Sequence, residues 1–131
     1  MKRNIIYMAK PVYGGWVSFT AHLSLIKGYP IYKIGNKTEK KERDYGYNCK
    51  YRNLSPDDAA KLDNILIACI DKNYYKHLSL IKSATIVIHD PTELKEPLLE
   101  HLPRFNIITI RKSVQDFLKK KYGLKSKFLV H

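Results

Sequence analysis

The chain has 131 residues, a length that suits one domain with one hydrophobic core, and we expect residues 1–131 to form a single domain. A hydrophobic fraction of 44% excludes an intrinsically disordered chain, and 24 basic against 12 acidic residues give a net charge of +12. So basic a domain is expected to attract polyanions such as nucleic acid, nucleotides or anionic lipid. A solvated basic surface without a specific partner is the alternative.

The two cysteines and the N-terminus bear on metal binding and location. Cys49 and Cys69 lie far apart, without a second cysteine or a histidine at the spacing of zinc ligands, so we expect no metal site. The start "MKRNIIYMAK" contains too short an apolar run for a signal peptide, and no apolar run approaches the length of a membrane span. These features predict a reduced, cytoplasmic protein without a transmembrane segment, in the host cytoplasm if the source is a virus.

In the first half of the chain, apolar runs alternate with helical and polar stretches. They predict a strand, a helix, a second strand, a polar loop and a second helix, over residues 4–9, 16–26, 30–35, 36–53 and 55–62. The loop carries six basic and three acidic residues, and it leaves room for a short strand only at "YNCKY" (47–51). Ser55, followed by Pro56 and two aspartates, is typical of a helix start.

The second half continues the alternation to the end of the sequence. It predicts a strand, a helix, a strand, an interrupted helix, a strand, a helix and a strand, over residues 64–70, 72–83, 84–89, 90–102, 105–110, 112–123 and 127–131. The run "NILIACI" is continuously apolar, as in a strand that is covered on both faces. Ser113 is predicted to cap the last helix and Gly123 to end it. The whole pattern predicts an α/β fold: a three-layer, Rossmann-like, doubly wound and mostly parallel sheet.

Ligands of open α/β sheets bind outside the carboxyl ends of the strands, so the residues that follow each strand are candidates for a binding site. These are Lys10, Tyr13, Gly14 and Gly15 after the first strand, Asp71 and Lys72 after 64–70, His89 and Asp90 after 84–89, and Arg111, Lys112 and Ser113 after 105–110. Two glycines, a histidine–aspartate pair and several cations at one rim would suit an anionic ligand.

Each of these features also has a purely structural explanation. Gly14 and Gly15 match neither the dinucleotide fingerprint nor a Walker loop, and glycines in a tight turn serve backbone geometry alone. His89 and Asp90 would then end a strand and cap the next helix, since an aspartate before Pro91 is a good cap. At this point the residues leave both explanations open.

Three segments resemble the N-terminal domain of GT-B-fold glycosyltransferases. "IIYMAKPVYGGWVSFTAHLSLI" is similar to their opening strand, glycine-containing loop and helix, with matches at Met8, Ala9, Lys10, Gly14 or Gly15, and Val17. "IVIHDP" resembles the strand after which many retaining enzymes have a histidine–aspartate or similar pair. "FNIITIRKSVQDFLKKKYGLKSKFLVH" resembles the strand, helix and turn that close the domain. The similarity covers most of the chain and is greatest to the phage DNA α-glucosyltransferases.

The resemblance implies the acceptor-binding half of an enzyme that takes a sugar from a nucleotide-sugar, here a UDP-sugar, without a covalently bound cofactor. It implies that Asp90 is the acid–base or polar group near the reacting hydroxyl, and that His89 lies beside the transferred sugar. Tyr13, Gly14 and Gly15 would approach the donor. The residues that would contact the acceptor or its phosphates, as in modified phage or viral DNA, are Lys10, Lys72, Arg111 and Lys112.

The sequence stops at His131, where the donor-binding domain of such an enzyme begins. The donor half would therefore lie in a C-terminal domain or in a partner chain, and the isolated domain is expected to lack turnover. The alternative is a non-catalytic nucleic-acid-binding or nucleotide-binding α/β module that uses the same rim. A response-regulator-like domain is disfavoured, because Lys10 stands where an acidic cluster would be needed.

Overall fold

The computed structural model describes residues 2–8, 14–34, 42–46 and 49–129. The strands within these ranges are β1 (Asn4–Met8), β2 (Ile31–Ile34), β3 (Glu42–Gly46), β4 (Cys49–Leu54), β5 (Ile65–Ile70), β6 (Thr85–Ile88), β7 (Asn106–Thr109) and β8 (Lys127–Phe128). The α-helices are α1 (Gly14–Lys27), α2 (Pro56–Ala60), α3 (Leu98–His101) and α4 (Lys112–Phe117). Tighter 3-10 helices form η1 (Lys72–Leu80), η2 (Pro91–Glu93) and η3 (Leu102–Arg104), and η4 (Leu118–Tyr122) extends α4 as a π-helical turn.

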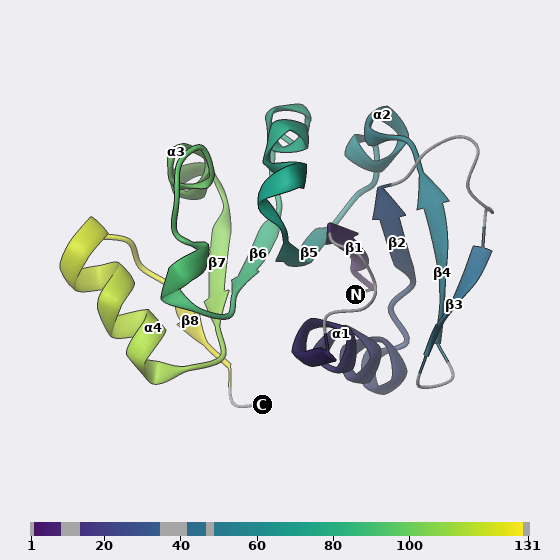
Figure 1. Ribbon diagram of the computed structural model, residues 1–131, viewed down its shortest axis with the longest axis horizontal. Coiled ribbons are helices and arrows are strands. Elements are labelled where there is room, and N and C mark those ends of the chain that lie inside the picture. Colours follow the sequence, from purple (N-terminus) through teal and green to yellow (C-terminus); the bar gives the residue numbers. More distant parts are fainter. Residues whose placement is uncertain (1, 9–13, 35–41, 47–48, 130–131) are drawn as a thin grey trace.

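The described strands form one sheet in the order β3-β4-β2-β1-β5-β6-β7-β8 (Figure 1). Strand β3 runs antiparallel to β4, whereas the remaining strands are parallel to one another. The chain winds from β1 to β2 and β4 in one direction, and from β5 to β6, β7 and β8 in the other. The strand order therefore switches between β1 and β5. This topology confirms the predicted Rossmann-like, doubly wound and mostly parallel sheet.

Helices cover both faces of the sheet, because right-handed crossovers that lead in opposite directions place their helices on opposite sides. Helix α1 covers one face, where its Phe19 and Ala21 pack with Ile5 of β1 and Leu66 of β5. The buried side chains of α2, η1, α3 and α4 pack on the other face in a second, larger core. Figure 1 shows α1 on one side of the strands and α2 and α3 on the opposite side.

Strand β5 is buried along its whole length, which confirms the prediction of a strand that is covered on both faces. Its pairing with β1 shifts register, from Ile6 opposite Ile67 to Tyr7 opposite Cys69. Ala68 is therefore an extra residue, and it packs on the α1 side together with Cys69, its neighbour in the chain. Such a bulge leaves the backbone of the extra residue outside the regular ladder.

The prediction of a surface loop was wrong for residues 42–46 and 49–53, although the possible short strand at 47–51 overlaps the observed β4. Residues 42–46 and 49–54 form the hairpin β3–β4, and β4 adds a parallel strand beside β2, with Ile31 opposite Tyr51. Polar composition concealed these strands because the hairpin lies at the edge of the sheet. The strand signal was the alternation around Tyr51, which is buried between the exposed Lys50 and Arg52.

The helix ends match the sequence in most places. Ser55 caps α2 by accepting a hydrogen bond from the backbone N–H of Asp58 (3.2 Å), and Gly123 ends the last helix with a φ of 66°. The predicted cap of α4 at Ser113 was wrong, because the helix begins at Lys112 and Arg111 holds the cap position without a side-chain bond. No helix in the described ranges combines the length and apolar character that crossing a bilayer requires.

Candidate functional site

His89 follows β6 and points toward helix α1. Its ring lies 5.0 Å from the ring of Phe19 and 6.3 Å from that of Trp16, measured between centroids. The side chain is only 8% exposed, and its Nε2 lies 2.6 Å from the carbonyl oxygen of the bulged Ala68. A carbonyl can only accept, so Nε2 carries a proton and donates it. The end of β6 is thereby fixed beside the first turn of α1, which starts at Gly14.

Asp90 is the next residue, and its carboxylate has two structural partners. Oδ1 accepts the backbone N–H of Thr92 (3.0 Å) and so caps η2, and Oδ2 lies 3.3 Å from the guanidinium of Arg111. Hydrogen bonds from the backbone and the side chain of Thr92, and to a smaller degree the charge of Arg111, hold the pKa of Asp90 below its ordinary value. Asp90 is therefore an ionised and partly exposed group at the rim.

Glu93 lies behind this pair and is a residue that the sequence interpretation missed. Its Oε2 accepts the backbone N–H groups of His89 (2.8 Å) and Asp90 (2.5 Å), which closes a capping box with Asp90. Glu93 is 8% exposed, and its Oε1 is buried without a hydrogen-bond partner among the described residues. Burial raises the pKa of Glu93 to about 7, although the two N–H bonds act in the opposite direction.

Burial also disfavours the negatively charged form of two side chains near Glu93. Burial raises the pKa of the Cys69 thiol well above its ordinary value, and the nearby carboxyl of Glu93 adds to that shift. The hydroxyl of Tyr75 donates to the main-chain oxygen of Glu93 (3.2 Å), and burial likewise raises the pKa of Tyr75. Cys69 is thus a protonated, buried thiol and a poor nucleophile.

Lys33 of β2 is a second residue that was missed. It is buried, which is rare for lysine, and its Nζ donates to the hydroxyl of Tyr74 (3.4 Å) and to the carbonyl of Ile34 (3.3 Å). The side chain therefore links β2 to η1 near the ends of the strands. A single lysine between the apolar residues of "IYKI" was the available signal.

The predicted site residues are only partly brought together. His89, Asp90 and Arg111 form one group, in which the His89 ring lies beside Trp16 in the first turn of α1, and we call these residues, with Glu93, the carboxyl-edge site. Gly14 and Gly15 are the first residues of α1, and Lys72 is the exposed first residue of η1. Lys112 lies along its own helix, 2.7 Å from the Gln115 side chain and 3.9 Å from that of Asp116. Lys10 and Tyr13 lie outside the described residues.

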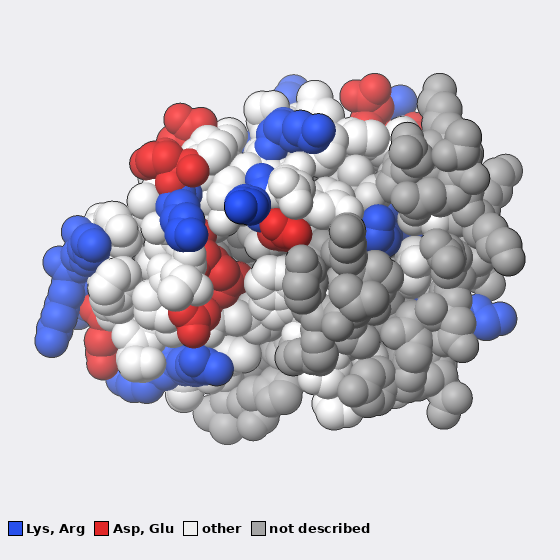
Figure 2. All heavy atoms as spheres, in the orientation of Figure 1, with Lys and Arg blue, Asp and Glu red and all other residues white. Residues whose placement is uncertain are grey.

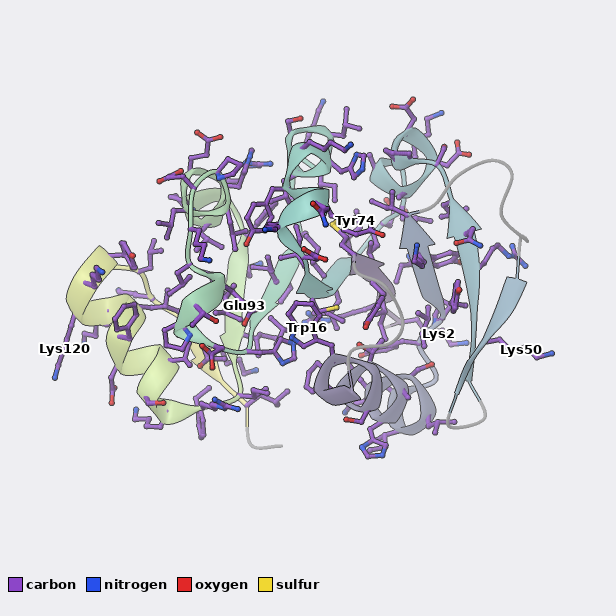
Figure 3. All side chains as sticks on the ribbon, in the orientation of Figure 1. Lys2, Trp16, Lys50, Tyr74, Glu93 and Lys120 are labelled. Atoms are coloured by element: carbon purple, nitrogen blue, oxygen red, sulfur yellow. The ribbon has the colours of Figure 1, made fainter. Side chains whose placement is uncertain are left out.

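Figures 2 and 3 show this face of the molecule. Carboxylates gather near the middle of the visible surface, with lysine and arginine side chains around them (Figure 2). Glu93, Trp16 and Tyr74, from η2, α1 and η1, lie around the same middle region (Figure 3). Within the described ranges no three histidine, cysteine, aspartate or glutamate side chains are placed to hold a metal ion together. Hydrogen bonds and the ion pair between Asp90 and Arg111 connect the residues of the site.

Comparisons with protein-family models, with curated proteins and with solved structures found no significant match to this chain. The site therefore has to be interpreted from its own geometry.

Proposed function

We propose that the chain is the acceptor-side half of a glycosyltransferase, which moves a sugar from a nucleotide-sugar, such as a UDP-sugar, to a hydroxyl group. The net charge of +12 favours an acceptor with phosphate groups, such as a modified base in phage or viral DNA, because phosphate contacts supply affinity at any sequence. A donor-binding half would complete the enzyme. The observation that carries the proposal is the position of His89 after β6, beside Trp16 in the first turn of α1, with Asp90 as the next residue in the chain.

This position agrees with where doubly wound sheets bind ligands. Their sites lie at the carboxyl ends of the strands, beside the point where the strand order switches. Here the switch lies between β1 and β5, whose ends are joined by a hydrogen bond from Asp71 N–H to the Met8 carbonyl (2.9 Å). His89 and Asp90 come from β6, the next strand. A sugar or phosphate at this rim would therefore meet the partly exposed carboxylate of Asp90, next to the buried ring of His89.

The two carboxyl groups of the β6–η2 segment suit different tasks. Asp90 stays ionised and is partly exposed, so it can accept a hydrogen bond from an acceptor hydroxyl or take up its proton. Glu93 holds the two backbone N–H groups and thereby sets the direction of His89 and Asp90. Environments that separate the pKa values of neighbouring carboxyl groups are a recurring basis for divided roles in catalysis.

A non-catalytic nucleotide-binding or nucleic-acid-binding module is the second candidate. It is favoured by the fact that both candidate groups already have structural partners. The His89 ring is buried and donates to a backbone carbonyl, and Asp90 caps η2 and pairs with Arg111. Such a module would bind its ligand at the same rim without transferring a sugar.

Replacing Asp90 by asparagine separates these candidates. Asparagine is as good a helix cap as aspartate, so Asp90→Asn keeps the bond to the Thr92 N–H and removes the charge together with the ion pair to Arg111. The assay is transfer of labelled sugar from a panel of UDP-sugars to DNA that carries hydroxymethylated bases, with the donor-binding half present. We expect turnover to fall by about 10²-fold or more, the range for loss of an acid–base group, with little change in the unfolding midpoint.

The matched control is Asp58→Asn, which removes an exposed carboxylate from the first turn of α2. It should leave turnover unchanged. Near-normal turnover of Asp90→Asn would refute the role assigned to Asp90. If the unaltered protein transfers none of these sugars yet binds the nucleotide or the DNA, the glycosyltransferase proposal fails and the binding module is supported.

A further inference from the structure

The opposite edge of the sheet, at the amino ends of the strands, carries a groove that the proposed function does not use. Two hollows of about 590 and 490 Å³ lie there, and both are lined by Arg3, Thr85 and Asn106. Because they share these residues, we treat them as one groove. Tyr29 lines one hollow, and Lys125 and Lys127 line the other. We call this surface the amino-edge groove.

The charge of the groove is predominantly positive. Arg3, Lys125 and Lys127 line the smaller hollow without any acidic residue, and Asp63 is the acidic residue in the lining of the larger one. Within the described part of the chain, these three cations make no ion pair and no side-chain hydrogen bond. Unpaired cations around a hollow attract anions more strongly than cations that are neutralised by neighbouring carboxylates.

Arg104 is a cation at the same edge whose side chain does have structural partners. Its guanidinium donates to the carbonyls of Leu78 (2.5 Å) and Ile81 (2.9 Å), which fastens the end of η1 to η3. Arg104 is therefore committed to structure. Arg3, Lys125 and Lys127 have no such carbonyl partners among the described residues, so a structural role does not account for them.

Further lysines lie on the last helix, whose end reaches the same edge of the sheet. The chain enters α4 at the carboxyl end of β7 and returns to the amino end of β8, so η4 lies at the same edge as Lys125. Lys119 and Lys120 of η4 are exposed. Figure 2 shows a row of lysine or arginine side chains at the left edge, over α4, and Figure 3 places Lys120 there.

The shape and the lining favour one class of anion. A groove lined by several cations suits a chain of phosphates better than a single phosphate ion or the flat surface of a bilayer. Tyr29 lines the larger hollow. Aromatic rings beside a basic groove are typical of single-strand binding, because unpaired bases stack on them.

We propose that the amino-edge groove binds the phosphate backbone of a single-stranded nucleic acid, at a site separate from the carboxyl-edge site. Arg3, Lys125 and Lys127 contact phosphates, and Tyr29 offers a stacking surface for a base. Neither a sugar donor nor the histidine–aspartate pair takes part in this binding.

The test is the fluorescence anisotropy of a labelled twelve-residue oligothymidylate, titrated with the full chain between 50 and 200 mM salt. For single strands, each phosphate contact contributes about −0.7 to the slope of log K against log salt, so three contacts give about −2. Arg3→Gln and Lys127→Gln should each reduce the slope by about 0.7 and weaken binding by about three- to tenfold. Circular dichroism verifies that both variants are folded.

Lys95→Gln is the matched control, because it removes the same charge from an exposed residue outside the groove. It should leave both affinity and slope unchanged. Equal losses in Lys95→Gln and Lys127→Gln would show general attraction and overturn the proposal. Binding to vesicles with anionic lipid but not to the oligonucleotide would overturn it in favour of a membrane. The readout is binding and not turnover, so failure here and failure of the proposed transferase are seen separately.

Discussion

Replacing Glu93 by glutamine should change how the stability of the protein depends on pH. Burial of the carboxyl raises its pKa from 4.5 to about 7 in the folded chain. Folding then favours the protonated form, so the group stabilises the fold at low pH. That contribution disappears as the pH rises from the unfolded pKa through the folded pKa. The Glu93 contribution should therefore fall between about pH 4.5 and pH 7 and stay low above that range.

The size of the effect follows from the shift. About 2.5 pKa units at about 1.36 kcal/mol each give about 3 kcal/mol of unfolding free energy. Glutamine keeps an oxygen that can accept the N–H groups of His89 and Asp90, and it carries no charge. Glu93→Gln should thus be more stable than the unchanged protein by less than about 1 kcal/mol at pH 5 and by up to about 3 kcal/mol at pH 8. In thermal unfolding this is a rise in Tm of roughly 10 °C.

The measurement is urea denaturation at pH 5, 6, 7 and 8, followed by circular dichroism and by the fluorescence of Trp16, the single tryptophan. His77 and His101 titrate in both proteins, so the difference between the two profiles isolates Glu93. Glu96→Gln removes an exposed carboxylate three residues away and should give a profile like that of the unchanged protein. Parallel profiles of Glu93→Gln and the unchanged protein would refute the inference of a protonated buried carboxyl.

Two further predictions concern Cys69 and Ser55. Cys69 should resist alkylation by iodoacetamide at pH 8 until the chain unfolds, because burial raises the pKa of its thiol. Peptide mass spectrometry locates the label. Rapid labelling of Cys69 in the folded protein would contradict this prediction. Ser55→Ala should lower the unfolding free energy by about 1 kcal/mol, since the Ser55 hydroxyl caps α2. The measurement is chemical denaturation, with Ser79→Ala, which changes an exposed serine in η1, as the control. Equal unfolding midpoints of the two variants would show that the cap contributes nothing.

Most of the fold could be predicted from hydrophobic patterning, and the failures have physical causes. Runs such as 65–70 are apolar because both of their faces are covered, so they are visible in the sequence. For the strands at 42–46 and 49–54 the sequence indicated only a loop with a possible short strand at 47–51, because an edge strand tolerates charged side chains on its open face. Residues 72–80 form a 3-10 helix, a distinction that a short pattern of apolar residues does not make.

The site was predictable to the same degree. Parallel strands bring their carboxyl ends to one edge, so the meeting of His89, Asp90 and Arg111 followed from the predicted topology. The capping box that involves Glu93 can be recognised in the sequence "DPTE". The burial of Glu93, which raises its pKa, cannot be recognised there. The position of Lys112 after β7 does not determine where its long side chain points, and here that side chain lies along its own helix.

The bulge at Ala68 gives the imidazole an anchor that belongs to the main chain. One additional residue in β5 frees a carbonyl, and the ring of His89 is held by that oxygen at 2.6 Å. Substituting the side chain at position 68 leaves this atom in place, whereas deleting the residue would restore an even ladder and take the anchor away. The orientation of the His89 ring thus depends on the number of residues in β5. Substitutions around the ring can change the chemistry of the site while that number stays the same.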